Sequence, residues 1–64
     1  MSLAIDLRGI IKFGEADNWS SDLLRLIIRA DPHNRELCRK AFPHAVEMIE
    51  HWKKTGEVLD LEED

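Results

Sequence analysis

The stretch RADPHNRELCRKAFPHAVEMIEHW, residues 29–52, contains both prolines of the chain, its single cysteine and all three histidines. Such a cluster is typical either of a chemical site or of boundaries between short helices. Asp is a favoured N-cap residue and Pro is favoured in the first helical turn, so Asp31-Pro32 ends one helix and begins the next. Pro43 repeats this signal. The prolines therefore predict two consecutive helices, over residues 32–42 and 43–55.

Lys53, Lys54 and Gly56 are typical of a helix end, because cations favour the last turn and glycine the position after it. On the other side of the prolines, the strongest helical pattern covers residues 20–30, with Asn18, Ser20 or Ser21 as the N-cap. At about 100° per residue, its apolar positions cover about half the circumference, more than a surface helix needs. The helix must therefore be covered from two sides, by other helices or by a second chain.

Residues 3–13 fit two patterns. As a helix, Leu3, Leu7, Ile10 and Ile11 line one face, whereas a strand would place alternate residues on its buried side. We favour the helix because the other elements are helical, and the strand stays open as the alternative. The sequence thus predicts an all-α fold, a small bundle of three to four short helices. Its predicted core consists of Leu23, Leu24, Ile27, Leu37, Cys38, Phe42, Ile49 and Trp52.

The charges divide the chain into a predicted domain over residues 1–56 and an acidic tail over residues 57–64. The tail holds five of the thirteen acidic residues and no base, which leaves eight acids and nine bases in the body. A near-neutral body lacks the basic field typical of nucleic-acid-binding proteins. One cysteine cannot form an internal disulfide, and there is no export signal or membrane-spanning apolar run. We therefore expect a cytoplasmic protein.

The histidines and the cysteine do not have the spacing of metal ligands. His44 and His51 are seven residues apart, which is roughly 10.5 Å along a helix and too far for one ion. His33 and Cys38 fall on different helix faces, and Cys38 lies one turn before Phe42 on the predicted buried face. The chain also contains no Gly-rich phosphate loop and no nucleophile motif. We expect no catalytic residue, no metal and no cofactor, and hence no enzyme.

Two functions from different classes remain. The first is a protein-interaction or self-associating module, expected to be a homodimer, because an apolar arc of this width must be covered. The rival explanation is that the N-terminal segment folds back over the helix and completes a monomeric bundle. Its contact residues are expected among Trp19, Leu24, Leu26 and Ile28, and the N-terminal segment is the other candidate.

The second function is a small DNA-binding regulator that uses residues 20–42 as a helix-turn-helix. The second helix of that motif enters the major groove, where Asn34, Arg35 and Arg39 would make the contacts. The abrupt Asp-Pro break, the near-neutral body and the acidic tail all argue against it. We therefore favour the interaction module and keep the regulator as the alternative.

The stretch LLRLIIRADPHNRELCRKAFPHAVEMIEHW resembles a pattern in short phage-encoded and prophage-like helical proteins of unknown function. In that pattern an apolar helix is followed by an Ala-Asp-Pro break, a helix that ends in Phe-Pro, and a last amphipathic helix. The match covers residues 19–52. The resemblance implies an origin in a mobile element and assigns no functional residue.

Overall fold

The described part of the chain is helical, as the capping signals predict. A computed structural model describes residues 3–14 and 18–61, and these contain four α-helices and no strand. The strand alternative for residues 3–13 is therefore wrong. The helices are α1 (Leu3–Phe13), α2 (Trp19–Arg29), α3 (Pro32–Ala41) and α4 (Pro43–Thr55).

The N-terminal caps come from side chains that the sequence singles out. The Asn18 side chain accepts a hydrogen bond from the backbone N–H of Ser21 at 2.9 Å and caps α2. The Asp31 side chain accepts one from the N–H of Asn34 at 2.8 Å and caps α3. Because these bonds satisfy N–H groups that have no partner inside the helix, each cap stabilises its helix start.

The prolines and the glycine also act as predicted. Pro32 and Pro43 occupy the first turns of α3 and α4. Helix α4 ends at Gly56, whose φ of 80° lies in the left-handed region that glycine enters without steric cost. Helix α3 ends at Ala41, one residue earlier than expected, and Phe42 caps it by donating its N–H to the carbonyl oxygen of Cys38 at 2.7 Å. The proline cluster thus marks helix boundaries.

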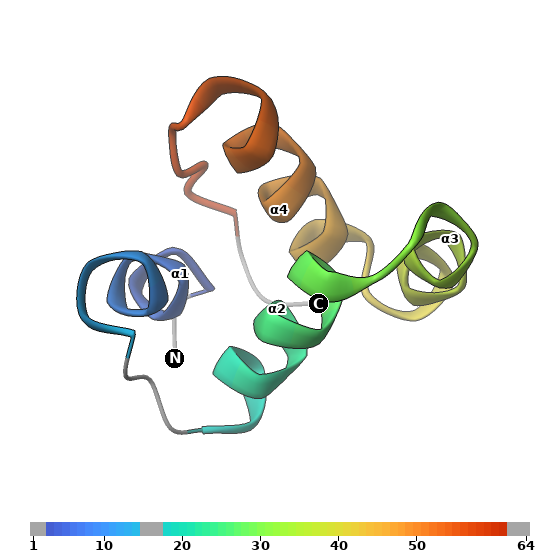
Figure 1. Cartoon of the computed structure of the whole chain (residues 1–64), viewed down its shortest axis with the longest axis horizontal. Helices are drawn as coiled ribbons and strands as arrows, with labels where there is room; N and C mark the ends of the chain where they lie inside the picture. The colour runs from blue at the N-terminus through green and yellow to red at the C-terminus, as the bar shows by residue number, and fades with distance from the viewer. Residues whose placement is uncertain (1–2, 15–17, 62–64) are drawn as a thin grey trace.

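Helix α2 lies in the middle of the molecule and contacts two other helices (Figure 1). It packs against α1 on one side and α4 on another, while α3 packs chiefly against α4. Figure 1 shows α1 and α3 at opposite sides of this arrangement. The buried core is drawn from α1, α2 and α4 and consists of Leu3, Ala4, Leu7, Leu24, Ile27, Ala45, Val46, Met48 and Ile49.

The predicted core is correct in part. Leu24, Ile27 and Ile49 are fully buried, and Leu23, Cys38, Phe42 and Trp52 are partly buried against the same cluster. Leu37 was wrongly placed in the core, because its side chain is 49% exposed. Helix α3 buries no residue fully, and both Leu37 and Ala41 are exposed.

The C-terminal segment is more than a solvated tail. Val58, Leu59 and Leu61 are partly buried and pack against the core. Part of the predicted acidic tail thus contributes to packing, and the acids Glu62, Glu63 and Asp64 lie outside the described residues. Within the ranges 3–14 and 18–61, no helix has the length and apolar character that crossing a membrane requires.

Candidate functional site: an apolar surface on α2

Helix α2 is apolar on two opposite sides. Leu24 and Ile27 are completely buried on its inner side, whereas Trp19 is 67% exposed and Leu26 is 60% exposed. Trp19 and Leu26 are seven residues apart, so they differ by only about 20° of rotation and share one face. We define the α2 outer face as Trp19, Leu23, Leu26 and Ala30. The wide apolar arc of the sequence is thus divided between the core and this exposed face.

One end of the α2 outer face is anchored by an aromatic pair. The rings of Trp19 and Phe42 lie with centroids 5.5 Å apart and planes tilted by 59°. Such tilted geometry is favourable for aromatic rings. Phe42 itself packs against the core, so the pair connects the start of α2 to the end of α3. The exposed indole is therefore in contact with a side chain that packs against the core.

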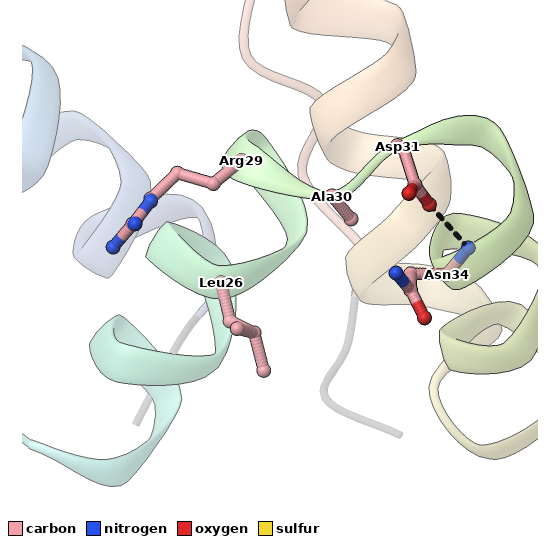
Figure 2. A pocket seen from close by; sticks show the side chains of 5 residues that line it. All are labelled: Leu26, Arg29, Ala30, Asp31 and Asn34. Atoms are coloured by element: carbon pink, nitrogen blue, oxygen red, sulfur yellow. Dashed lines mark hydrogen bonds between the residues drawn. The ribbon is translucent and has the colours of Figure 1, made fainter.

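Two hollows adjoin Leu26. One has a volume of about 200 Å³ and is lined by Trp19, Asp22, Leu23 and Leu26. The other, about 430 Å³, lies where α2 meets α3 and is lined by Leu26, Arg29, Ala30, Asp31 and Asn34. Figure 2 shows the Leu26 side chain projecting from α2 between the ribbons of α2 and α3. A projecting leucine with a hollow on either side is suited to interlocking with side chains of another protein surface.

Opposite charges stand along one edge of the α2 outer face. Asp22 is exposed and pairs with Arg25 of the same helix at 3.1 Å. Arg29 is exposed and makes no ion pair with any residue in the described part of the chain. In Figure 2 the Arg29 side chain extends away from Asn34, on the side of α2 opposite α3. The edge away from α3 thus has an acid near one end and a base near the other.

Two of the four predicted contact residues belong to this surface. Trp19 and Leu26 are exposed on it, but Leu24 is fully buried within the chain and Ile28 is partly buried against the core. Leu24 is therefore not available to a partner in this fold. Leu23 and Ala30 line the hollows and were not among the predicted contact residues. The spacing of 19, 23, 26 and 30 is the sequence signal that indicates one face.

The arginines of the DNA-binding alternative are engaged inside the fold. Arg39 donates to the carboxylate of Glu50 at 2.6 Å and to that of Glu36 at 3.1 Å. Arg35 lies 4.0 Å from the same Glu50 carboxylate and donates to the Ala30 carbonyl oxygen at 3.1 Å. Glu50 is therefore only partly exposed and contacts both arginines. These contacts direct both guanidinium groups towards α4 and the end of α2.

The ion pairs of Glu50 also change the pKa values of Glu50 and Arg39. The hydrogen bond from Arg39 lowers the pKa of Glu50 below its usual value, with further electrostatic contributions from Arg39 and Arg35. The same contact raises the pKa of Arg39 even further above the neutral range. Glu50 thus stays ionised and holds α3 to α4. Asn34, the third residue of the alternative, is exposed, and its backbone N–H is used by the Asp31 cap.

The histidines and the cysteine do not assemble into a metal site. Within residues 3–14 and 18–61, no group of three His, Cys, Asp or Glu side chains is placed to hold an ion. Cys38 is partly buried and packs against the core, while His33 is exposed at the start of α3. The absence of a metal, a cofactor and a catalytic residue stays a prediction.

Helix α1, the other candidate contact segment, also exposes apolar residues. Ile5 is 67% exposed, Phe13 69% and Ile11 45%. At about 100° per residue these three positions project to well-separated directions around the helix. They form no continuous stripe, in contrast to Trp19 and Leu26. The α2 outer face is therefore the stronger candidate surface.

Comparisons with known proteins add no relative. No protein-family model, no curated protein and no solved structure matches this chain.

Proposed function

We propose that this chain is a small, non-enzymatic protein-interaction module that binds another protein chain through the α2 outer face. The observation that carries the proposal is the exposure of Trp19 and Leu26 on one face of a helix whose opposite face is fully buried. Exposed apolar side chains that gather on one face are typical of interaction surfaces. Trp is also enriched among the residues that dominate binding energy.

The surroundings of these two residues support the same function. The contact with Phe42 restrains Trp19 before a partner arrives, so little side-chain entropy is lost on binding. The hollows beside Leu26 supply the concave part of a complementary surface.

Site-directed photo-crosslinking tests the proposal. A benzophenone side chain is introduced at position 26 of the full chain, or at position 47 as a control. Glu47 is exposed on α4 and is not part of the α2 outer face. We expect position 26 to crosslink to a discrete protein and position 47 to give none. The crosslinked protein is then purified and its affinity for the chain is measured by calorimetry.

Two matched variants make that measurement specific. Leu26→Asp places a charge on the α2 outer face, and Ile5→Asp makes the same kind of change on α1. Both residues are at least 60% exposed, so both variants are expected to fold. Leu26→Asp should weaken binding at least about tenfold, because a desolvated carboxylate at an apolar contact is costly, and Ile5→Asp should not. Equal binding by all three proteins would contradict the proposal, as would equal crosslinking from positions 26 and 47.

The DNA-binding alternative gains no support from the ion pairs of Arg35 and Arg39. Proteins that neutralise phosphates show binding that falls steeply with salt. A mobility-shift assay on duplex DNA across a salt series therefore separates the two functions. We expect no shift at micromolar protein. A salt-sensitive shift abolished by Asn34→Ala, which leaves the Glu50 ion pairs intact, would favour the regulator.

The cytoplasmic location and the resemblance of residues 19–52 to phage-encoded proteins stay proposals. Both are compatible with a small interaction module. Neither contributes to the case for the α2 outer face.

A further inference from the structure

We propose that the partner of the α2 outer face is a second copy of this chain, with the two α2 helices antiparallel about a two-fold axis beside Leu26. This inference rests on the proposed function, because it names the occupant of the same surface. It accounts for the charged edge of α2 as well as for the exposed apolar residues.

The charges along this edge are self-complementary. Asp22 and Arg29 are seven residues apart, so they lie roughly 10.5 Å apart along the helix and within about 20° of the same direction. A two-fold axis perpendicular to two antiparallel helices brings the same edge of both together and reverses its order. When the axis passes midway between these residues, Asp22 of each copy lies beside Arg29 of the other. Two equivalent ion pairs then form.

The same register aligns the apolar residues. The midpoint between positions 22 and 29 falls next to Leu26, so the two Leu26 side chains meet close to the axis. Trp19 of each copy then faces the far end of α2 in the other copy. That end holds the hollow of about 430 Å³ between α2 and α3. In this one register, Leu26 contacts Leu26 of the other copy, and Trp19 faces the larger hollow of the other copy.

A parallel arrangement does not satisfy these charges. With the two-fold axis parallel to the helices, the charged edges of the two copies lie on opposite sides of the contact. Asp22 of one copy then does not meet Arg29 of the other, so neither ion pair forms. The antiparallel arrangement also sets the partial negative end of each helix beside the partial positive end of the other. The electrostatics of α2 therefore select one orientation.

The size of the surface indicates a weak dimer. Helix α2 has eleven residues, which makes it about 16 Å long. Its outer face is smaller than the roughly 800 Å² per partner of a standard stable interface. We therefore expect a dissociation constant in the micromolar range, to be measured between roughly 1 and 500 µM chain. Sedimentation equilibrium of the full chain is suited to that range.

Charge reversal at the two edge residues tests the geometry. Asp22→Lys and Arg29→Glu each place two pairs of like charges across the axis, so each variant alone should dimerise at least about tenfold more weakly. An equimolar mixture of the two variants brings opposite charges together again and should recover association to within about threefold of wild type. The doubly reversed chain should recover its own dimer in the same way.

Matched controls exclude effects of net charge and of folding. Glu47→Lys and Arg8→Glu make the same changes of charge on exposed positions of α4 and α1 and should leave dimerisation unchanged. Because Asp22 also pairs with Arg25, circular dichroism checks the helix content of every variant. Should Asp22→Lys unfold the chain, the dissociation constant of wild type against salt gives the second measurement. It should rise with salt, because exposed ion pairs are screened.

The outcomes separate this inference from the proposed function. Wild-type chain that stays monomeric to 500 µM, roughly the upper end of a weak interface, overturns the second-copy proposal. A crosslink from position 26 to a different protein would leave the proposed function standing in that case. A dimer that both single reversals weaken and that their mixture does not restore overturns the antiparallel register. Restored association in the mixture supports it.

Discussion

Helices α2 and α3 follow one another in the chain and have nearly the same length, yet different forces hold them in the fold. Helix α2 has eleven residues and buries Leu24 and Ile27 completely. Helix α3 has ten residues and buries none of them fully. Its contacts with the rest of the molecule include the ion pairs of Arg35 and Arg39 with Glu50. Helix α2 is thus secured by complete burial of two side chains, whereas α3 combines partial burial with ion pairs to α4.

The difference matters for function because the arginines of α3 make contacts within the fold, whereas some apolar residues of α2 do not. The two arginines of α3 look available for a ligand, but the Glu50 contacts engage them within the fold. The apolar residues of α2 exceed what its inner face needs, and Trp19 and Leu26 remain exposed. The side chains that remain exposed after a helix has made its contacts within the fold are therefore the better guide to what it binds.

The largest difference is expected when one aliphatic residue on each helix is truncated to alanine. Ile27→Ala should lower the free energy of unfolding by about 2–5 kcal/mol, because Ile27 is fully buried and its truncation leaves a cavity. Leu37→Ala should change it by less than about 0.5 kcal/mol, since Leu37 is about half exposed. Urea denaturation at one fixed chain concentration measures both. Similar losses for the two variants would show that α3 is also secured by burial.

The next comparison concerns the two caps. Asp31→Ala should cost about 1 kcal/mol, the usual contribution of an N-cap side chain. Asn18→Ala should cost about 2–3 kcal/mol, because the Asn18 side chain also donates to the carboxylate of buried Asp6 at 3.2 Å. Thermal denaturation followed by circular dichroism ranks the two variants. Equal losses would mean that the Asp6 contact contributes nothing beyond the cap.

A smaller effect is expected at the charges that hold α3. Glu50→Gln removes the acidic partner of both arginines and should lower Tm by roughly 2–5 °C at neutral pH. The folded-state pKa of Glu50 lies below its usual value of 4.5, so its stabilising effect is present above that pH. The effect is lost as the pH falls through the folded-state pKa, because the protonated carboxyl no longer pairs with arginine.

Melting curves from pH 7 down to about pH 2 reveal this dependence. The difference in Tm between wild type and Glu50→Gln should be largest near neutrality and should shrink in acid. Glu47→Gln is the control, because Glu47 is exposed on the same helix. A difference that persists unchanged to the lowest pH would show that the shape of the Glu50 side chain, and not its charge, holds α3.

Much of the architecture could be predicted because helix boundaries are local. Asn18 and Asp31 satisfy backbone groups three residues away, and Pro32 and Pro43 restrict only their immediate neighbours. The candidate surface was only partly predictable. Trp19 and Leu26 were named together with Leu24, which lies on the opposite side of the same helix. A wide apolar arc gives no sign of which half faces the core.

The sequence by itself determined that this chain forms short helices, where they are capped, and that α2 has more apolar surface than one contact can cover. Only the tertiary structure decided which half of that surface stays exposed, because the choice depends on where α1 and α4 pack. It also decided the role of Arg35 and Arg39, since their partner Glu50 lies on another helix. Capping is a contact between near neighbours in the chain, whereas burial and ion pairing between helices require the assembled fold.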